Sequence, residues 1–564
     1  MNPTPSWTPV TALYHWEKTR PDEVFLTQPK GGEVIDYTWA QTGDQVRRMA
    51  QHLTSLGFAP GSRIAIMSKN CAHWIMAELA ILMAGHVSVP IYPSVNAETL
   101  RYILEHSESA LMFLGGMEDW TETRAGVPDR LPIITLPGAP SFDPPRENVL
   151  PWDDLVAVTP PMQGQVPPRK ADDLALIIYT SGSTGQPKGV MIGFGAMAFA
   201  ANTSEQLVSE INPGDRVLSY LPLAHAYEHA GILAAGLRYG LRIYFNESLA
   251  TFQEDLRRAR PMSFLSVPRL WVKFQLGILQ RLPQEKLDAL LADPATAEPT
   301  RRQLLEQLGL QDARFAVTGS APLPAAVLDW YRKLGLELLE GYGMTEDFAY
   351  SHISFPGKTR VGYVGSPLNG VERRISESGE ILVRSPAQML GYYKQPELTK
   401  ESFTEDGFFK TGDMGEIDEE GRLKITGRVK ELFKTSKGKY VAPAPIENVL
   451  GAHPGVEVAL VMGSGQPSAF GMVMLSAEAQ QAAQRAEVRN EIMRGLEELL
   501  QSINSKLQAH ERLEFVAVAK EQWTIANGFL TPTMKIRRNI IEKHYEPLFD
   551  AWFAARKPVV WAEA

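Results

Sequence analysis

Glycines and hydroxyl-bearing residues gather between Tyr179 and Val190, in a segment with the composition of a phosphate-binding loop. The segment reads Tyr-Thr-Ser-Gly-Ser-Thr-Gly-Gln-Pro-Lys-Gly-Val and follows the apolar run Leu174-Ala-Leu-Ile-Ile, which predicts a buried strand. Glycine lets the backbone turn tightly and bring its N–H groups close to a ligand. A concave set of donors with one cation suits a polyphosphate. The residues expected to contact the phosphates are Thr180, Ser181, Gly182, Ser183, Thr184, Gly185 and Lys188.

The spacing in this loop differs from that of a Walker A motif, in which Gly-Lys-Ser/Thr follows four spacer residues. Here Lys188 lies between Pro187 and Gly189. A flexible Gly/Ser linker is the alternative interpretation. The preceding strand and the ordered Pro-Lys-Gly favour a phosphate loop over a linker.

Two further glycine-containing segments end or follow predicted strands and could hold a nucleotide base and a metal ion. The first is Thr318-Gly-Ser-Ala-Pro-Leu, and the second is Glu340-Gly-Tyr-Gly-Met-Thr-Glu346, which places an aromatic ring between two glycines. A flat base could lie against Tyr342, and Glu346 offers the hard oxygen that Mg²⁺ prefers. The alternatives are a plain turn for the first segment and a bend with a solvated carboxylate for the second.

Four charged or titratable residues stand in segments that could complete a nucleotide site. His225 follows a predicted strand in Leu-Pro-Leu-Ala-His, Asp413 ends Gly-Phe-Phe-Lys-Thr-Gly-Asp, and Arg428 lies in Thr-Gly-Arg-Val-Lys-Glu. Lys535 precedes two arginines near the C-terminus. Taken alone, the histidine has about even odds of being structural, and the other three have the character of exposed charges.

In their order along the chain, these motifs resemble those of the adenylate-forming (AMP-binding) superfamily, which includes acyl-CoA synthetases, luciferases and peptide-synthetase adenylation domains. The run from Leu221 is similar to the Leu-Pro-Leu-Ala-His-x-x-Glu motif of fatty acyl-CoA synthetases, and the run from Leu530 is similar to their Leu-Thr-Pro-Thr-x-Lys motif. Ser266-Val-Pro-Arg-Leu-Trp resembles the long-chain branch. The resemblance extends from about Thr11 to Tyr545.

The resemblance implies a role for each motif. The two glycine segments would hold adenine, Thr184 and Glu346 would help to hold Mg²⁺, and Asp413 would bind the ribose. Lys430 falls at the family's hinge position between domains. The catalytic residues implied are Lys535, Glu346, Thr184 and His225. The nucleotide contacts implied beyond the phosphate loop are Gly319, Ser320, Ala321, Glu340, Gly341, Tyr342, Gly343, Thr345, Asp413, Arg428 and Lys434.

The reaction that the resemblance implies is the activation of a fatty acid with ATP and Mg²⁺, followed by transfer of the acyl group to coenzyme A. A synthetase of medium-chain or aryl acids is one alternative, and a ligase that loads a carrier protein is another. A third alternative is a nucleotide-sensing or lipid-binding protein without catalysis. The segment Gly438-Lys-Tyr-Val-Ala-Pro resembles the stretch lining the thioesterification site, which favours free coenzyme A.

Alternating strands and helices are expected to position these loops. Residues 40–92 are predicted to run helix, strand, helix, strand, and the alternation continues with strands at 216–221, 241–245, 264–267 and 315–317. This order predicts an α/β fold in which a large N-terminal domain contains parallel-rich sheets flanked by helices. Ligands bind at the carboxyl ends of such strands, where the motifs lie.

The pattern changes near Gly427, where a small, mobile α+β C-terminal domain is predicted to begin. Strands are expected at 423–425, 456–462 and 470–475, followed by a long polar helix from about Gln480 to Leu507. The expected domains are therefore 1–427 and 428–564. The proline-rich residues 137–168 are predicted to form a surface excursion with few regular elements.

The composition of the chain also limits which kinds of protein and partner are consistent with it. A chain of 564 residues with 44% hydrophobic and 21% charged residues is typical of a soluble protein with two or more domains. The net charge of −9 argues against nucleic acid as a partner. The single cysteine, with no visible signal peptide and no unbroken apolar run, predicts a cytoplasmic location. Peripheral membrane contact and the choice between monomer and homodimer stay open.

Overall fold

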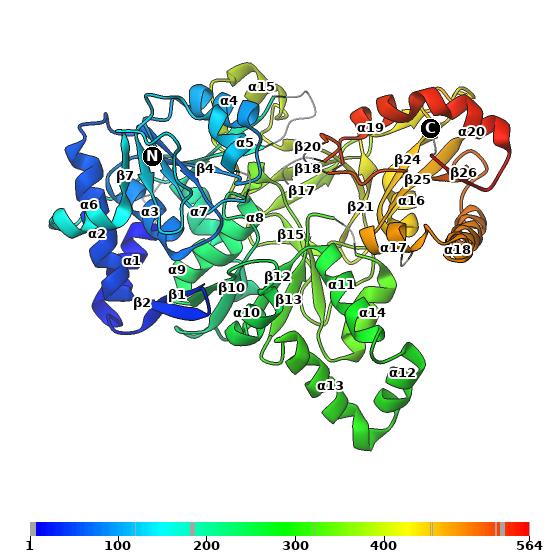
Figure 1. Cartoon of the computed structure of the whole chain (residues 1–564), viewed down its shortest axis with the longest axis horizontal. Coiled ribbons are helices and arrows are strands. Elements are labelled where there is room, and N and C mark those ends of the chain that lie inside the picture. The colour runs from blue at the N-terminus through cyan, green and yellow to red at the C-terminus, as the bar shows by residue number, and fades with distance from the viewer. Residues whose placement is uncertain are drawn as a thin grey trace. The chain divides into compact units, whose positions relative to one another are not determined.

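The computed structural model describes residues 7–118, 120–180, 186–321, 323–451, 453, 455–524, 527–530 and 536–562. The chain forms two compact units (Figure 1). The first comprises Met1–Ala321, Ala326–Arg373 and Val383–Phe409, and the second comprises Pro322–Ala325, Arg374–Leu382 and Lys410–Ala564. Each unit is described by itself below.

The largest sheet of the first unit has eight strands in the order β19-β9-β8-β4-β3-β5-β6-β7. The six strands from β8 to β7 run parallel to one another, whereas β9 pairs antiparallel with both β8 and β19. The strands are β3 (Arg63–Met67), β4 (Val87–Ile91), β5 (Leu111–Leu114), β6 (Ile133–Thr135), β7 (Val149–Pro151), β8 (Leu174–Thr180), β9 (Lys188–Gly193) and β19 (Gly391–Tyr392).

The sequence of these strands explains the parallel arrangement. Every residue of β4 is buried, and β8 is buried along all but its first and last residues, as expected for strands covered on both faces. Helix α3 (Ala72–Met83) is buried at every position, because its sequence is apolar almost all round. It contacts α2 (Trp39–Ser55), whose buried positions recur at helical spacing.

Two smaller sheets complete the first unit. One has the order β12-β13-β14-β15-β16, with its first three strands parallel, and the other has the order β10-β11-β1-β2. Their strands are β1 (Val24–Lys30), β2 (Glu33–Thr38), β10 (Arg216–Ser219), β11 (Arg242–Phe245), β12 (Ser263–Ser266), β13 (Phe315–Thr318), β14 (Leu338–Tyr342), β15 (His352–Ile353) and β16 (Ser366–Pro367). The predicted α/β fold with parallel-rich sheets is confirmed.

Helices lie between most of these strands. The further helices in or bordering the first unit are α1 (Pro9–Thr19), α4 (Ala97–Ser107), α5 (Trp120–Thr123), α6 (Trp152–Val158), α7 (Phe194–Ala200), α8 (Ala226–Glu228), α9 (Ala235–Tyr239), α10 (Phe252–Ala259), α11 (Pro268–Leu279), α12 (Gln284–Ala292), α13 (Pro294–Leu308), α14 (Ala325–Lys333) and α15 (Pro396–Glu401). A π-helix, His229–Ala234, lies between α8 and α9.

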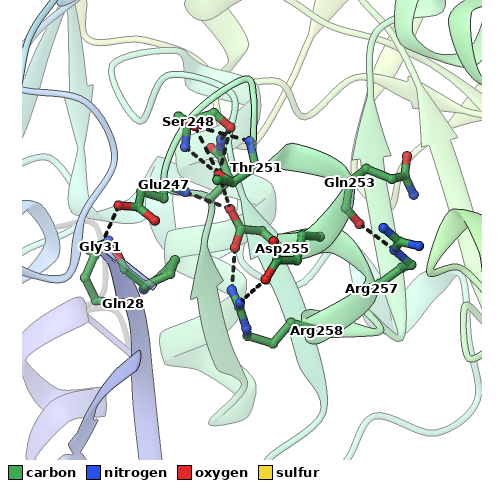
Figure 2. Close-up of polar contacts among 12 residues, drawn as sticks. Gln28, Gly31, Glu247, Ser248, Thr251, Gln253, Asp255, Arg257 and Arg258 are labelled. Carbon is green, nitrogen blue, oxygen red and sulfur yellow. Dashed lines mark hydrogen bonds and ion pairs between the residues drawn. The ribbon is translucent and has the colours of Figure 1, made fainter. Parts of the chain in front are cut away.

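A buried carboxylate fixes the turn that follows β11 (Figure 2). Asp255 of α10 is 2% exposed, and its Oδ2 accepts hydrogen bonds from the Glu247 backbone N–H at 2.9 Å and the Thr251 hydroxyl at 2.8 Å. Its Oδ1 is paired with Arg258. Glu247 in turn accepts from the N–H of Gly31, which joins this turn to the β1–β2 hairpin. These bonds satisfy the buried acid and make it a structural group.

The second unit is α+β, as predicted. Its principal sheet has the order β24-β25-β26-β27, and a second sheet of order β17-β18-β20-β21 lies largely within it. The strands are β17 (Glu372–Ile375), β18 (Glu380–Arg384), β20 (Phe409–Ile417), β21 (Leu423–Arg428), β22 (Phe433–Lys434), β23 (Tyr440–Val441), β24 (Val456–Met462), β25 (Ala469–Leu475), β26 (Leu513–Val518) and β27 (Val559–Trp561). The helices are α16 (Pro443–Leu450), α17 (Ala477–Ala482), α18 (Ala486–Asn504), α19 (Arg538–Tyr545) and α20 (Phe549–Ala555).

One sequence-based expectation about elements was wrong. The long helix expected from Gln480 to Leu507 is two helices, because Arg485 adopts an extended conformation (φ −83°, ψ 125°) between α17 and α18. The proline-rich segment 137–168 contains two short elements, β7 and α6, and has only Trp152 and Leu155 buried, as expected for a surface excursion with few regular elements. Strand β7 is the edge strand of its sheet, where a proline such as Pro151 is tolerated.

The compact units do not divide at the expected residue. The second unit contains every residue from Lys410 onward, whereas the expected domain boundary lies at Arg428. Residues 410–417 and 423–427 belong to β20 and β21, which pair with each other from Asp413–Arg428 to Ile417–Leu423. The boundary at 428 therefore remains a prediction about where rotation occurs.

Candidate active site

The two segments predicted to hold a base lie side by side in the first unit. Strands β13 and β14 are parallel neighbours, with Thr318 paired to Glu340, so the residues after each strand emerge at the same edge. A Cβ atom placed on Gly319 would lie 3.3 Å from the carbonyl oxygen of Gly341 and 4.0 Å from Cζ of Tyr227. Gly319, Gly341 and Tyr227 therefore adjoin one another.

The backbone at this edge has two unusual positions. Ser320 is exposed and has a φ of +69°, in the left-handed region that side chains rarely adopt. A Cβ atom on Gly343 would lie 2.9 Å from Cα of Ala349, because the chain folds back onto itself after β14. Only glycine fits at residue 343 without displacing the backbone of Ala349. This steric requirement explains why a glycine follows Tyr342.

Tyr342 is half-buried and pairs in register with His352 of β15. Their ring centroids are 6.1 Å apart with the planes tilted at 52°. Burial, with a smaller contribution from Arg373, lowers the pKa of His352 to about 3. The imidazole beside Tyr342 is therefore neutral near pH 7.

Glu346 and Lys188 are brought together by a residue that the sequence did not single out. Tyr392 of β19 donates a hydrogen bond from its hydroxyl to Oε1 of Glu346 at 2.8 Å. The ammonium of Lys188 lies 5.2 Å from the centroid of the Tyr392 ring, within cation–π range. Burial, and then the Glu346 carboxylate, raises the pKa of Tyr392, so its hydroxyl keeps its proton. Lys188 of the predicted phosphate loop and the predicted metal ligand thus share one neighbour.

The acidic residue after Glu346 is buried within the turn. Asp347 is 3% exposed, and its Oδ1 accepts from the backbone N–H of Met344 at 2.9 Å. Burial raises the pKa of Asp347 to about 7. The aspartate fixes the turn from within, and the half-buried Glu346 is the more accessible carboxylate.

His225 lies at the N-cap of α8, where its Nδ1 accepts from the backbone N–H of Tyr227 at 3.2 Å. This bond leaves Nε2 as the nitrogen that carries a proton in the neutral ring. Tyr227 is also the residue that adjoins Gly319, so the turn holding His225 borders the predicted adenine segments.

The predicted ribose residues are paired within the second unit. Arg428 donates from Nε to Oδ1 of Asp413 at 2.7 Å, across the β20–β21 pair. Arg428 is about half exposed (52%), whereas Asp413 is only 15% exposed. Lys430 follows β21 and is exposed, and the ammonium of Lys434 lies 5.4 Å from the Tyr440 ring centroid.

Comparison with known proteins identifies the family. Residues 13–393 match the model of the AMP-binding enzyme family, and residues 431–557 match that of the AMP-binding enzyme C-terminal domain. The chain belongs to the AMP-binding enzyme family. The expected superfamily resemblance is thereby confirmed.

Relatives and solved structures agree with this assignment. The chain is 29% identical to the long-chain-fatty-acid–CoA ligase FadD15 of Mycobacterium tuberculosis over 96% of both proteins. It is 27% identical to long chain acyl-CoA synthetase 2 of Arabidopsis thaliana, over 96% of this chain and 91% of the relative. The adenylation domain of a carboxylate reductase from Mycobacterium chelonae shares the fold, with a TM-score of 0.79, 23% identity and coverage of 98% of this chain and 92% of that domain.

Some of the predicted site residues lie outside the described part of the chain. These are Ser181, Gly182, Ser183, Thr184, Gly185 and Lys535. The ends of the predicted phosphate loop are described, and Thr180 of β8 pairs antiparallel with Lys188 of β9, so the loop connects two adjacent strands. Residues Leu530 and Ile536, on either side of Lys535, form an antiparallel bridge. The roles of Thr184 and Lys535 remain predictions.

A metal site built from several clustered ligands is not found among the residues that the structure describes, where no three His, Cys, Asp or Glu side chains gather suitably. A single positioned carboxylate such as Glu346 still suits Mg²⁺, which usually takes one or two carboxylates together with phosphate and water. Within the described residues, no helix combines the length and apolar character needed to cross a bilayer.

Proposed function

We propose that this AMP-binding enzyme activates a long-chain fatty acid as an acyl-adenylate and transfers the acyl group to coenzyme A. The observation that carries the proposal is the convergence of Lys188, Glu346 and Tyr392 in the unit that also pairs the predicted adenine segments. Relatives named as long-chain ligases align over 96% of the chain, which supports the choice of substrate class.

In the first step, a carboxylate oxygen of the fatty acid attacks the α-phosphorus of ATP. A new P–O bond forms, the bond to the β-phosphate oxygen breaks, and pyrophosphate leaves. Negative charge on the α-phosphoryl oxygens increases, so preorganised cations and donors would lower the barrier. We assign Lys188 and Lys535 this role together with the backbone of the phosphate loop.

Glu346 is the proposed Mg²⁺ ligand, with Thr184 as its partner. Bound Mg²⁺ would supply positive charge and hold the phosphate oxygens in place. The hydrogen bond from Tyr392 fixes one oxygen of the Glu346 carboxylate and leaves the other for ligation. Tyr392 is therefore a positioning residue in this site.

In the second step, the thiol of coenzyme A attacks the acyl carbonyl carbon. A C–S bond forms, the thiol loses its proton to solvent, the C–O bond to AMP breaks, and AMP leaves as a good leaving group. Asp413 and Arg428 are the proposed contacts to the ribose and phosphate of the adenylate. Lys430 is the proposed hinge about which the C-terminal domain rotates between the two steps.

The proposal is tested by measuring coenzyme-A-dependent release of AMP from ATP and Mg²⁺ with acetate, octanoate, palmitate, oleate and benzoate. Activity confined to palmitate and oleate is the expected result. Strong activity with octanoate or benzoate would instead identify medium-chain or aryl acids as the substrate class. Pyrophosphate release without thioester would indicate a carrier protein as acceptor, and no reaction with any acid would overturn the proposal.

A further inference from the structure

A second histidine follows the turn that holds His225, and it is buried away from the reacting groups. His229 is fully buried and is the first residue of the π-helix His229–Ala234. Its Nδ1 lies 3.1 Å from the carbonyl oxygen of Leu223, and its Nε2 lies 2.9 Å from Oε1 of Glu78. Because a carbonyl oxygen can only accept a hydrogen bond, Nδ1 carries a hydrogen atom and donates a hydrogen bond to the Leu223 carbonyl oxygen.

The partner carboxylate comes from α3, a helix outside the predicted site. Glu78 is 1% exposed, and its second oxygen accepts from the hydroxyl of Ser88 at 3.0 Å. A buried polar group is costly to leave without a partner, and the 2.9 Å contact between Nε2 and Oε1 keeps the imidazole beside Glu78. Helix α3 is thus linked, through Glu78 and then His229, to the turn that contains Leu223.

A residue just before α3 contacts the same turn from another side. Asn70 donates from Nδ2 to the carbonyl oxygen of Leu221 at 2.6 Å, and its Oδ1 accepts from the N–H of Leu223 at 3.0 Å. The same Nδ2 lies 2.8 Å from the hydroxyl of Ser219 at the end of β10. The Asn70 side chain therefore holds the backbone that leads into His225 directly, whereas Glu78 is linked to it only through His229.

His229 also connects this turn to the one that contains Glu346. Its backbone N–H donates to the carbonyl oxygen of His225 at 3.0 Å. Its ring packs edge-to-face against Phe348, with centroids 5.5 Å apart, and Phe348 directly follows the Thr345–Asp347 turn. The buried imidazole is therefore in contact with both turns that carry predicted catalytic residues.

We propose that Asn70 and His229 are positioning residues that hold the 221–225 turn and thereby set the place of His225 during adenylation. The inference rests on the proposed function. The essential contact is the one from His229 Nδ1 to Leu223, whereas the contact to Glu78 mainly stabilises the fold. A shift of about 1 Å in a catalytic group can lower a rate by up to about a hundredfold.

Two substitutions of His229 separate the two contacts. In His229→Gln the amide can occupy the place of Nε2 beside Glu78 but does not reach Leu223. In His229→Asn the amide can occupy the place of Nδ1 and donate to Leu223 but leaves Glu78 without its partner. His73→Gln is the matched control, because His73 is also a buried histidine, lies on α3 and packs between the rings of Tyr37 and Trp152.

The test is acid-dependent exchange of labelled pyrophosphate into ATP with palmitate, together with thermal melting of each variant. His229→Gln should lower kcat of exchange by about tenfold to a hundredfold, with the KM for ATP and the Tm little changed. His229→Asn should lower the Tm and keep most of the exchange activity. His73→Gln should lower the Tm alone.

Normal exchange in His229→Gln, or a loss that follows the Tm in all three variants, would overturn the inference. Asn70→Ala provides a second test if His229→Gln does not fold, since Asn70 lies nearer the surface and should affect kcat in the same way. Normal exchange in Asn70→Ala would then contradict the proposal. Absence of exchange in the wild-type protein with every acid would overturn the proposed function itself.

Discussion

At the scale of single residues, the hydrogen bond from Tyr392 to Glu346 is the contact that most directly defines the candidate site. The sequence predicted Glu346 and Lys188 from their own motifs, but it contained no sign of Tyr392. The tyrosine reaches them because β19 pairs with β9, about 200 residues away in the chain. Such a pairing produces no local pattern, so only the structure could show it.

Replacement of Tyr392 by phenylalanine tests its role in metal binding. Tyr392→Phe should raise the Mg²⁺ concentration for half-maximal adenylation by several-fold and cost about 1 kcal/mol of stability, because the carboxylate loses a donor. The measurement is pyrophosphate exchange across a Mg²⁺ titration. Tyr393→Phe is the control, since Tyr393 is the adjacent tyrosine and contacts β9 through its backbone N–H. An unchanged Mg²⁺ requirement in Tyr392→Phe would contradict the assignment.

Replacement of Lys535 tests the residue predicted from its motif alone. Lys535→Ala should lower adenylation by about 10²–10³ if the lysine acts like one preorganised donor to the α-phosphate. Thioester formation from supplied acyl-adenylate should continue, because that step no longer requires the charge. Lys543→Ala, an exposed lysine of α19, is the control. A loss of adenylation rate below about tenfold would show that Lys535 has no catalytic role and is an ordinary surface lysine.

At the scale of elements, the alternation of strands and helices explains why the two glycine segments could be predicted to lie side by side. The alternation of strands and helices predicted parallel neighbours, and β13 and β14 are indeed paired with Thr318 opposite Glu340. Strand β24 was predicted with its observed bounds, Val456–Met462. The break between α17 and α18 was missed, because neither glycine nor proline marks residues 483–485.

A methyl group at Gly343 tests the close approach of the backbone after β14. Gly343→Ala should cost about 1–3 kcal/mol of stability and weaken ATP binding, because the Cβ would lie 2.9 Å from Cα of Ala349. Gly277→Ala is the control: Gly277 lies in α11, where an added Cβ would have no neighbour within 4 Å, so alanine should be neutral or stabilise by up to about 1 kcal/mol. Chemical denaturation measures the free energy of unfolding of each variant, and ATP titration measures its affinity for ATP. Equal stability of the two variants would contradict the steric explanation.

At the scale of the whole molecule, buried titratable groups make stability depend on pH. Glu228 is fully buried, with Oε1 accepting from the Ser219 hydroxyl and the Tyr220 N–H. Burial raises its pKa to about 8 from 4.5. Between these values the folded protein holds a proton that the unfolded chain has released, so stability falls as pH rises.

Glu228→Gln tests this pH dependence. The wild-type protein should lose up to about 1.4 kcal/mol of stability per pH unit between pH 5 and 8 through this group. The glutamine variant should lack that part of the slope, because its amide oxygen can accept the same two bonds without titrating. Urea denaturation at several pH values measures the difference. Parallel slopes for the two proteins would contradict the raised pKa.

The central claim, that the chain forms an acyl-adenylate and then a thioester, is tested most directly with palmitate labelled by ¹⁸O in its carboxylate. If the carboxylate attacks the α-phosphate and the thiol then attacks the carbonyl carbon, one ¹⁸O atom remains on the AMP that is released. Mass spectrometry of the nucleotide product should therefore show singly labelled AMP, in an amount equal to the palmitoyl-CoA formed. Unlabelled AMP, or ADP as the nucleotide product, would contradict the mechanism.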